Sequence, residues 1–361
     1  MGNFIDYIRE SGKETFAQRA FTEVDNLVLA MTSYIDFRGI AASMEENQRI
    51  TVEQAAKRYR ELHENQIPEE LEAMAESKRF GQLLLSDYEE VFRTAKEKTQ
   101  FAAVHISSED GFDYISFRGT DESFVGWREN FTMSYQVIPA QRHAADYLNR
   151  ILDRVNHSIY VGGHSKGGML SVYAAASLTS EKAKQIKKIF SNDGPWLCKD
   201  IIDEKSYLGI KDKIIRISPD FSIIGTLFSK EKPDIIIKSS ANGPGEHDAF
   251  TWQICNHQFM HSNDLQDKCK IYCRIIDGWM KKVSLTEREI FVKDLFHALE
   301  QAGAPSMYQL GTVGAGGLKR ILFTFGKGRK ESKLVMGKLF GQFLYGIFAN
   351  FGVYFHREAV A

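Results

Sequence analysis

Several features are scarce in this chain of 361 residues, and each scarcity excludes a class of protein. The four cysteines are scattered and too few for a disulfide framework, which fits a reducing compartment. A formal net charge of −1 gives no reason to expect a nucleic-acid partner. The N-terminus lacks the continuous apolar stretch of a secretion signal, and Asp6 stands where a myristoylation site needs Ser or Thr. We therefore expect a cytoplasmic globular protein.

The most informative feature that is present is a strand followed directly by a glycine-rich turn and a helical run. A short apolar strand ends at Gly162, the turn reads Gly163-His-Ser-Lys-Gly167, and residues 168–178 contain neither proline nor charge. The G-x-S-x-G motif alone is weak, but this context is typical of a nucleophile elbow. In such an elbow the Ser165 hydroxyl stands clear of the sheet, and the Lys166 amide faces any oxyanion that forms.

The hydrophobic pattern divides the chain into three zones. Residues 1–78 predict a helical N-terminal segment that packs on the core, residues 79–285 an α/β core, and residues 286–361 a helical extension that is basic first and apolar afterwards. In the core, short apolar runs alternate with helical segments, which predicts a mostly parallel central sheet flanked by helices. A helix is expected over 140–155, and strands are expected at 101–106 and 113–117, which form a hairpin, and at 159–162, 188–191, 214–218 and 234–238.

An elbow serine needs an acid and a histidine, and both are expected on loops that follow later strands. Asp220 comes immediately after the strand expected at 214–218, and His247 lies in a glycine-rich loop after the next strand. His247 would act as the general base for Ser165, and Asp220 would orient the imidazole. The alternatives are a turn residue for Asp220 and a helix-capping role for His247.

Asp193 competes for the role of the acid. It follows the preceding strand in the sequence Asn192-Asp-Gly-Pro195, and some hydrolases place the acid one strand earlier. Asp-Gly-Pro is also an ordinary turn sequence, and this is the interpretation that we favour. Asp220 is therefore the expected acid and Asp193 the alternative acid.

An oxyanion site needs a second donor besides the Lys166 amide, and Thr120 is the candidate. It follows the strand expected at 113–117 in the sequence Phe117-Arg-Gly-Thr120, where the glycine permits close approach of the backbone and the threonine offers an amide and a hydroxyl. The alternative is a turn fixed by an ion pair between Arg118 and Asp121. Both can hold together, because the turn must be fixed before Thr120 can donate.

Five side chains of metal-ligating types lie close together in the sequence, but their spacing is poor for a zinc site. Cys269 shares a helical face with Leu265 and Tyr272, so we expect it in the core. We expect no metal and no organic cofactor. The five side chains are Cys255, His257, His261, Cys269 and Cys273.

Residues 117–120 and 163–168 together resemble the class 3, or fungal-type, lipase family, and more closely a group of bacterial lipase-like α/β hydrolases of unassigned function. The resemblance extends to stretches within roughly residues 20–285. It implies an α/β-hydrolase fold and a Ser, Asp, His triad, carried here onto Ser165, Asp220 and His247, with Thr120 as an oxyanion residue. Further stretches that resemble the closer group are 21–29, 117–127 and 247–252.

The chain departs from that pattern in two places. Fungal lipases usually have an apolar residue where this chain has Lys166, and a Gly-x-Pro-Arg-like run where it has 192–195. The lysine at position 166 leaves the main-chain amide of that residue available as an oxyanion donor. Both changes weaken the case for lipid as the natural substrate.

These features predict a serine hydrolase of the lipase or esterase type that cleaves carboxylic esters, small or lipid, through an acyl-enzyme intermediate. One alternative is a non-catalytic binding or regulatory protein on the same scaffold, because a fold does not guarantee an activity. Another is a serine acyl hydrolase that acts on thioesters or amides, because the same constellation serves all of them.

The C-terminal zone combines positive charge with apolar residues. Its basic stretch carries seven lysines and arginines against Glu331 alone, and residues 339–355 are rich in aromatic side chains. Gln342 and Asn350 interrupt this run, which is short for a membrane span. We favour helices packed on the core, and the alternative is peripheral contact with a membrane surface.

Overall fold

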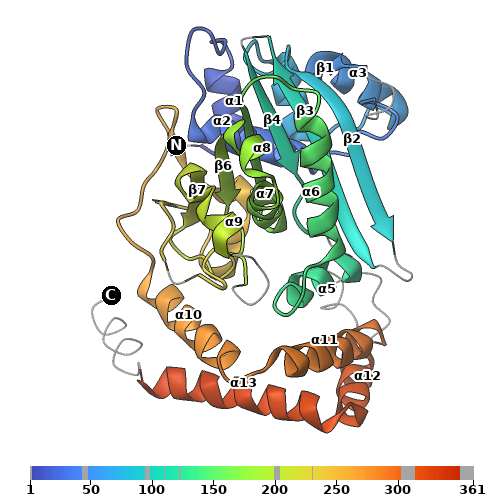
Figure 1. Cartoon of the computed structure of the whole chain (residues 1–361), viewed down its shortest axis with the longest axis vertical. Coiled ribbons are helices and arrows are strands. Elements are labelled where there is room, and N and C mark those ends of the chain that lie inside the picture. The colour runs from blue at the N-terminus through green and yellow to red at the C-terminus, as the bar shows by residue number, and fades with distance from the viewer. Residues whose placement is uncertain are drawn as a thin grey trace.

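An eight-stranded sheet runs through the centre of the molecule, and its strand order follows the chain order (Figure 1). The structure is a computed structural model that describes residues 2–42, 48–93, 98–109, 111–121, 123–198, 204–229, 231–301 and 314–349. The strands are β1 (Ile50–Thr51), β2 (Leu84–Arg93), β3 (Thr99–Ser108), β4 (Phe112–Phe117), β5 (Ile159–His164), β6 (Ile186–Asn192), β7 (Ile214–Pro219) and β8 (Ile235–Ile237).

The sheet has an antiparallel half and a parallel half. Strands β1 to β4 pair antiparallel, and β4 to β8 pair parallel. The carboxyl ends of β4 to β8 therefore meet along one edge, where the loops of an α/β sheet carry its functional side chains. The predicted hairpin is β3 and β4, and the other four predicted strands correspond to β5 to β8.

Neighbouring residues on each strand pack on opposite faces of the sheet. Ile115 and Val161 point toward α6 (Pro139–Leu152) and α7 (Lys166–Ala176), where Leu148 and Leu170 complete the core. The adjacent residues Tyr114, Tyr160 and Phe190 belong to a second core on the other face, with residues of the N-terminal helices. Both faces of the sheet are thus covered, as predicted.

The N-terminal helices begin with side-chain caps that the sequence carries. Asn3, Thr22 and Thr51 each form a capping box at the start of a helix. A buried ion pair links the second of the four N-terminal helices to the turn after the fourth, because Arg79 Nε and Nη2 each lie 2.7 Å from a carboxylate oxygen of Asp25. The helices are α1 (Phe4–Ser11), α2 (Glu23–Thr32), α3 (Val52–Leu62) and α4 (Glu69–Glu76).

Four C-terminal helices lie together at one end of the molecule, coloured orange to red in Figure 1. They share a small core that includes Val283, Phe291, Phe296 and Val335. Among the residues described, no helix is both long enough and apolar enough to cross a membrane. The helices are α10 (Asp267–Met280), α11 (Leu285–Glu300), α12 (Gly314–Lys327) and α13 (Lys330–Ala349). Residues 302–313 and 350–361 of this predicted zone lie outside the described residues.

The remaining elements are short and connect the sheet strands or follow them. They are α5 (Phe124–Thr132), α8 (Ser180–Lys184), α9 (Glu204–Leu208), the 3₁₀ turns η1 (Lys211–Lys213), η2 (Gly243–His247) and η3 (Ala249–Thr251), and a two-stranded hairpin of β9 (Ile254–Cys255) and β10 (Gln258–Phe259). The sheet is parallel from β4 to β8 and is covered by helices on both faces, which agrees with the predicted α/β-hydrolase fold class.

Candidate active site

Ser165 lies in a strained turn between β5 and α7. Its φ is 57° and its ψ is −129°, a conformation that is costly for a residue with a side chain. The two glycines of the motif permit this corner: a Cβ on Gly163 would lie 2.5 Å from the Phe117 carbonyl oxygen, and one on Gly167 would overlap the same oxygen. The predicted nucleophile elbow is thus present as a backbone structure.

His247 bridges Ser165 and a carboxylate. Its Nε2 lies 3.0 Å from Ser165 Oγ, and its Nδ1 lies 2.6 Å from Asp193 Oδ2. When Nδ1–H donates to the carboxylate, Nε2 is left to accept the Ser165 hydroxyl proton. This is the connectivity that a serine nucleophile with a general base requires.

The carboxylate on His247 is that of Asp193, so the expectation that Asp220 holds this position is wrong. The sheet order explains the difference, because β6 lies directly beside β5 whereas β7 is one strand farther away. His164 pairs with Asn192 in this register, which brings the residues that follow, Ser165 and Asp193, to the same edge. Asp220 Oδ1 instead accepts a hydrogen bond from Gln266 Nε2 at 2.6 Å.

Asp193 is held rigidly and is fully buried. Its φ is 48°, and its amide donates to the Ile217 carbonyl oxygen at 2.7 Å. Its Oδ1 accepts the hydroxyl of Ser222, while Oδ2 faces His247. A buried carboxylate with two such donors is suited to orienting an imidazole and to stabilising its protonated form.

Two residues that sequence reasoning did not select hold the backbone around His247. Glu246 Oε2 accepts the amide of Phe221 at 3.0 Å, and its carbonyl oxygen accepts the indole N–H of Trp252 at 2.9 Å. Burial, together with the nearby Asp220 carboxylate, raises the pKa of Glu246 to about 7. No motif marks this residue, since its role depends on contacts that only the fold creates.

The second of these residues is His164, inside the elbow motif. Its Nε2–H donates to the His247 carbonyl oxygen at 2.8 Å, and its Nδ1 accepts the Tyr34 hydroxyl at 3.1 Å. Burial and the neighbouring His247 lower the pKa of His164 to about 3, so the ring is neutral at physiological pH. His164 therefore supports the backbone of His247 without competing for its proton.

Thr120 and the Lys166 amide, the two expected oxyanion donors, both line the cavity that contains Ser165. Lys166 is the first residue of α7, and the first amides of a helix have no intrahelical partner. The Thr120 hydroxyl donates to Asn130 Oδ1 at 2.8 Å, which leaves its main-chain amide for an oxyanion. The suggested ion pair between Arg118 and Asp121 is wrong, because Arg118 Nη2 pairs with Glu90 at 2.7 Å.

The Lys166 side chain, the unusual residue of the elbow, is fully buried beneath it. Its Nζ donates to Glu129 Oε2 at 2.8 Å and to the carbonyl and side-chain oxygens of Gln100, each at 2.7 Å. Glu129 belongs to α5 and also accepts the Thr99 hydroxyl at 2.8 Å. The elbow is thus tied by charge to β3 and to the helix that forms one wall of the cavity.

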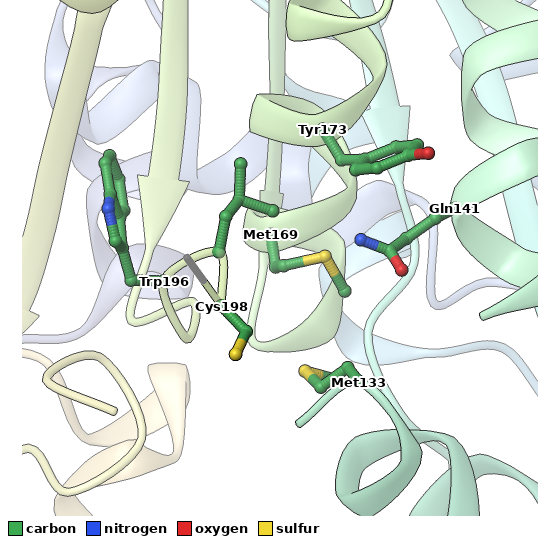
Figure 2. Close-up of a pocket in the computed structure, with 7 residues that line it drawn as sticks. Met133, Gln141, Met169, Tyr173, Trp196 and Cys198 are labelled. Atoms are coloured by element: carbon green, nitrogen blue, oxygen red, sulfur yellow. The ribbon is translucent and has the colours of Figure 1, made fainter. Parts of the chain in front are cut away.

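The cavity above Ser165 has a volume of about 780 Å³ and a largely apolar lining. A much smaller pocket of about 10 Å³, which Met133 also lines, lies between residues of α6, α7 and the loop after β6 (Figure 2). It has room for roughly one water molecule, so this region is closely packed. The apolar side chains of the large cavity include Met31, Trp127, Met133, Ile224, Leu227 and Phe250.

The cysteines and histidines that the sequence places close together are dispersed in the fold. Cys269 and Cys273 lie on α10 with their sulfur atoms 3.8 Å apart, whereas His257 lies in the turn between β9 and β10 and contacts Ser11. In the part of the chain that the structure describes, no three His, Cys, Asp or Glu side chains come together as a metal site would require.

Comparison with known proteins places the chain in a family. No curated protein matches it. A solved structure titled "Crystal structure of M37 lipase" is 20% identical, covers 57% of this chain and 70% of its own, and has a TM-score of 0.33. The Mbeg1-like family model matches residues 74–297, which is well over half of the chain. A bacterial origin and a relation to class 3 lipases remain predictions, but the chain belongs to the Mbeg1-like family.

Proposed function

We propose that this protein is a serine hydrolase that cleaves carboxylic esters with an apolar acyl group through an acyl-enzyme intermediate. One observation carries the proposal: Ser165, His247 and Asp193 form a continuous hydrogen-bonded chain at a strained elbow, inside an apolar cavity. The α/β architecture, with these side chains on loops at the carboxyl ends of parallel strands, agrees with this assignment.

The chemistry follows from the direction of these hydrogen bonds. Ser165 Oγ attacks the ester carbonyl carbon while His247 Nε2 accepts its proton, and the carbonyl oxygen becomes an oxyanion facing the amides of Lys166 and Thr120. The carbon–oxygen bond of the ester then breaks, and the leaving alcohol takes the proton back from Nε2. Water repeats the sequence on the acyl-enzyme, which releases the carboxylic acid and restores the Ser165 hydroxyl.

The cavity indicates the class of substrate. A volume of about 780 Å³ lies in the range of sites that bury most of a drug-sized ligand. Its walls carry methionine, tryptophan and aliphatic side chains, which favour an alkyl or aryl acyl group over a polar one. We therefore expect activity to rise with acyl chain length until the cavity is filled.

Substitution of Ser165 by alanine tests the assignment directly. The wild-type chain should hydrolyse p-nitrophenyl esters and react covalently with a fluorophosphonate probe, whereas Ser165→Ala should lose labelling and on the order of 10⁶-fold in kcat. A matched control is Ser177→Ala, at the exposed residue that follows α7, which should keep both properties. Esterase activity that survives in Ser165→Ala would refute the proposal.

The same assay separates the neighbouring chemistries. Thioesters and anilides with the same acyl group should react more slowly than the ester when kcat/KM values are compared. Faster hydrolysis of a thioester would move the assignment to a thioesterase. A wild-type chain that neither turns over any substrate nor reacts with the probe would indicate a binding protein on this scaffold.

A further inference from the structure

Helices α12 and α13 each have an inner face that packs and an outer face that does not. On the inner side, Ser332 and Val335 are fully buried, and Phe325 packs against the ring of Phe291. On the outer side, Leu322 and Phe323 are each 64% exposed and Leu334 is 58% exposed. These three side chains are therefore not required for the core of the C-terminal layer.

Basic residues are frequent in the same two helices as these exposed apolar side chains. The described part of α12 and α13, with the two residues between them, carries a single acidic side chain, Glu331, against seven basic ones. Lys319, Phe323 and Lys327 follow one another at intervals of four residues, so they share one side of α12. Lys327 Nζ lies 4.0 Å from the centre of the Phe323 ring. The basic residues are Lys319, Arg320, Lys327, Arg329, Lys330, Lys333 and Lys338.

Internal contacts use only part of this charge. Arg329 pairs with Asp294 at 2.6 Å, and Lys338 pairs with Glu287 at 2.6 Å. Lys319, Lys330 and Lys333 are exposed and form no ion pair within the described residues. Because the whole chain has a formal net charge of −1, this end of the molecule is a local concentration of unneutralised positive charge.

We propose that the outer face of α12 and α13 docks onto the surface of an anionic lipid bilayer. Leu322, Phe323 and Leu334 would enter the boundary between headgroups and acyl chains, and the lysines beside them would remain among the lipid phosphates. Lysine is depleted from protein–protein interfaces, whereas lysines around apolar side chains are typical of helices that bind at a membrane surface. A second copy of this chain would bring the same positive charge to the contact, which disfavours self-association there.

This surface is connected to the proposed site of hydrolysis. Phe296 of α11 packs against Phe131 of α5 with ring centres 5.5 Å apart, and α5 contributes Trp127 and Asn130 to the wall of the cavity. Docking would therefore place the C-terminal helices on the bilayer, and these helices contact the helix that lines the cavity.

Flotation of the full chain with lipid vesicles tests this proposal. The wild type should float with vesicles of phosphatidylcholine and phosphatidylserine, should float much less with phosphatidylcholine alone, and should be released by high salt. Leu322→Ser with Phe323→Ser should lose flotation. The triple variant Lys319→Gln, Lys330→Gln, Lys333→Gln should lower the partition coefficient on the order of 100-fold, because each lysine near an anionic surface contributes about fivefold.

Matched controls change residues of similar exposure elsewhere. Leu62→Ser with Leu208→Ser removes two apolar side chains that are 56% and 58% exposed, and Lys13, Lys57 and Lys78 changed to Gln remove three exposed charges. Both controls should float like the wild type. Circular dichroism should show the same helical content in every variant, so that loss of flotation is not loss of folding.

Three outcomes would overturn the proposal. The first is a wild type that shows no preference for anionic vesicles. The second is a Leu322→Ser, Phe323→Ser variant that floats like the wild type. The third is a wild type that does not float but forms a dimer in light scattering, with a variant Leu322→Ser, Phe323→Ser that is monomeric. The result is independent of the proposed hydrolase, because Ser165→Ala should float unchanged.

Discussion

At the scale of single residues, the acid of the site depends on which strand lies beside the nucleophile. Asp193 and Asp220 both follow a strand of the parallel half, and both have the chemistry to orient a histidine. Only Asp193 reaches His247, because β6 is the immediate neighbour of β5. The turn sequence Asn-Asp-Gly-Pro thus carries a buried carboxylate that contacts His247.

Comparison of two conservative variants tests this difference. Asp193→Asn should lower kcat by on the order of 10⁴-fold with KM little changed, because the amide favours the wrong tautomer of His247. Asp220→Asn should stay within a few-fold of the wild type, because its side chain contacts Gln266 and not the imidazole. Steady-state kinetics on one ester under identical conditions decides the matter, and equal losses in the two variants would contradict it.

The turn that holds Ser165 could be predicted from the sequence, because a local pattern encodes it, whereas His247 was selected only from its place after a later strand. Gly163 and Gly167 are needed by a corner that lies within five residues. The choice between the two acids, and the supporting roles of His164 and Glu246, depend on strand order and on contacts between loops far apart in the chain. No local pattern contains that information.

At the scale of elements, the predicted strands were those with continuous apolar runs, and the missed ones lack such runs. Strand β2 is ten residues long but carries acidic residues and ends exposed, and its pairing with β3 is interrupted at Asp87, where φ is 55°. The hairpin of β9 and β10 has two residues in each strand and turns through Asn256 and His257, both with positive φ. Elements this short have too few residues to show a period.

The stability of the folded chain should depend on pH because of Glu246, which precedes His247. Because the pKa of Glu246 is about 7 in the folded chain against an ordinary 4.5, the folded state binds its proton more tightly than the unfolded state does. Its contribution to stability is therefore fully present below about pH 4.5 and is lost as the pH rises through about 7. Glu246→Gln should remove this part of the pH dependence.

Urea midpoints at pH 5 and pH 8 measure the effect. The urea midpoint should fall less from pH 5 to pH 8 in Glu246→Gln than in the wild type. In the control Glu64→Gln, at an exposed position, the midpoint should fall as much as in the wild type. The same decline in all three proteins would show that Glu246 does not titrate in this range.

At the scale of the whole molecule, a buried ion pair within the N-terminal zone links α2 to the turn that follows α4. Arg79 and Asp25 are both fully buried, and Arg79 Nη1 also donates to the Arg19 carbonyl oxygen at 2.9 Å. The guanidinium carbon lies 3.9 Å from the centre of the Phe16 ring. Removal of one partner leaves the other charged and without compensation in the interior.

Arg79→Met should therefore lower the free energy of unfolding by about 3–5 kcal/mol. Arg9→Met breaks an ion pair with Glu69 in which both side chains are more than half exposed, so it should cost less than about 1 kcal/mol. Urea unfolding followed by circular dichroism gives both values. Equal small losses would mean that the buried pair contributes no more than the exposed one.

The lysine beneath the elbow has a consequence for how sequences of this family can diverge. Loss of either Glu129 or Lys166 leaves the other charge buried without its partner, which lowers the free energy of unfolding. Two apolar residues of similar volume could replace the pair together. Relatives should thus have either both charges or neither. In urea unfolding, the double change Lys166→Met, Glu129→Leu should lower the free energy of unfolding by less than either change alone. Sequence change beneath the cavity would then proceed by paired exchanges, because each such exchange involves one residue of α7 and one residue of α5.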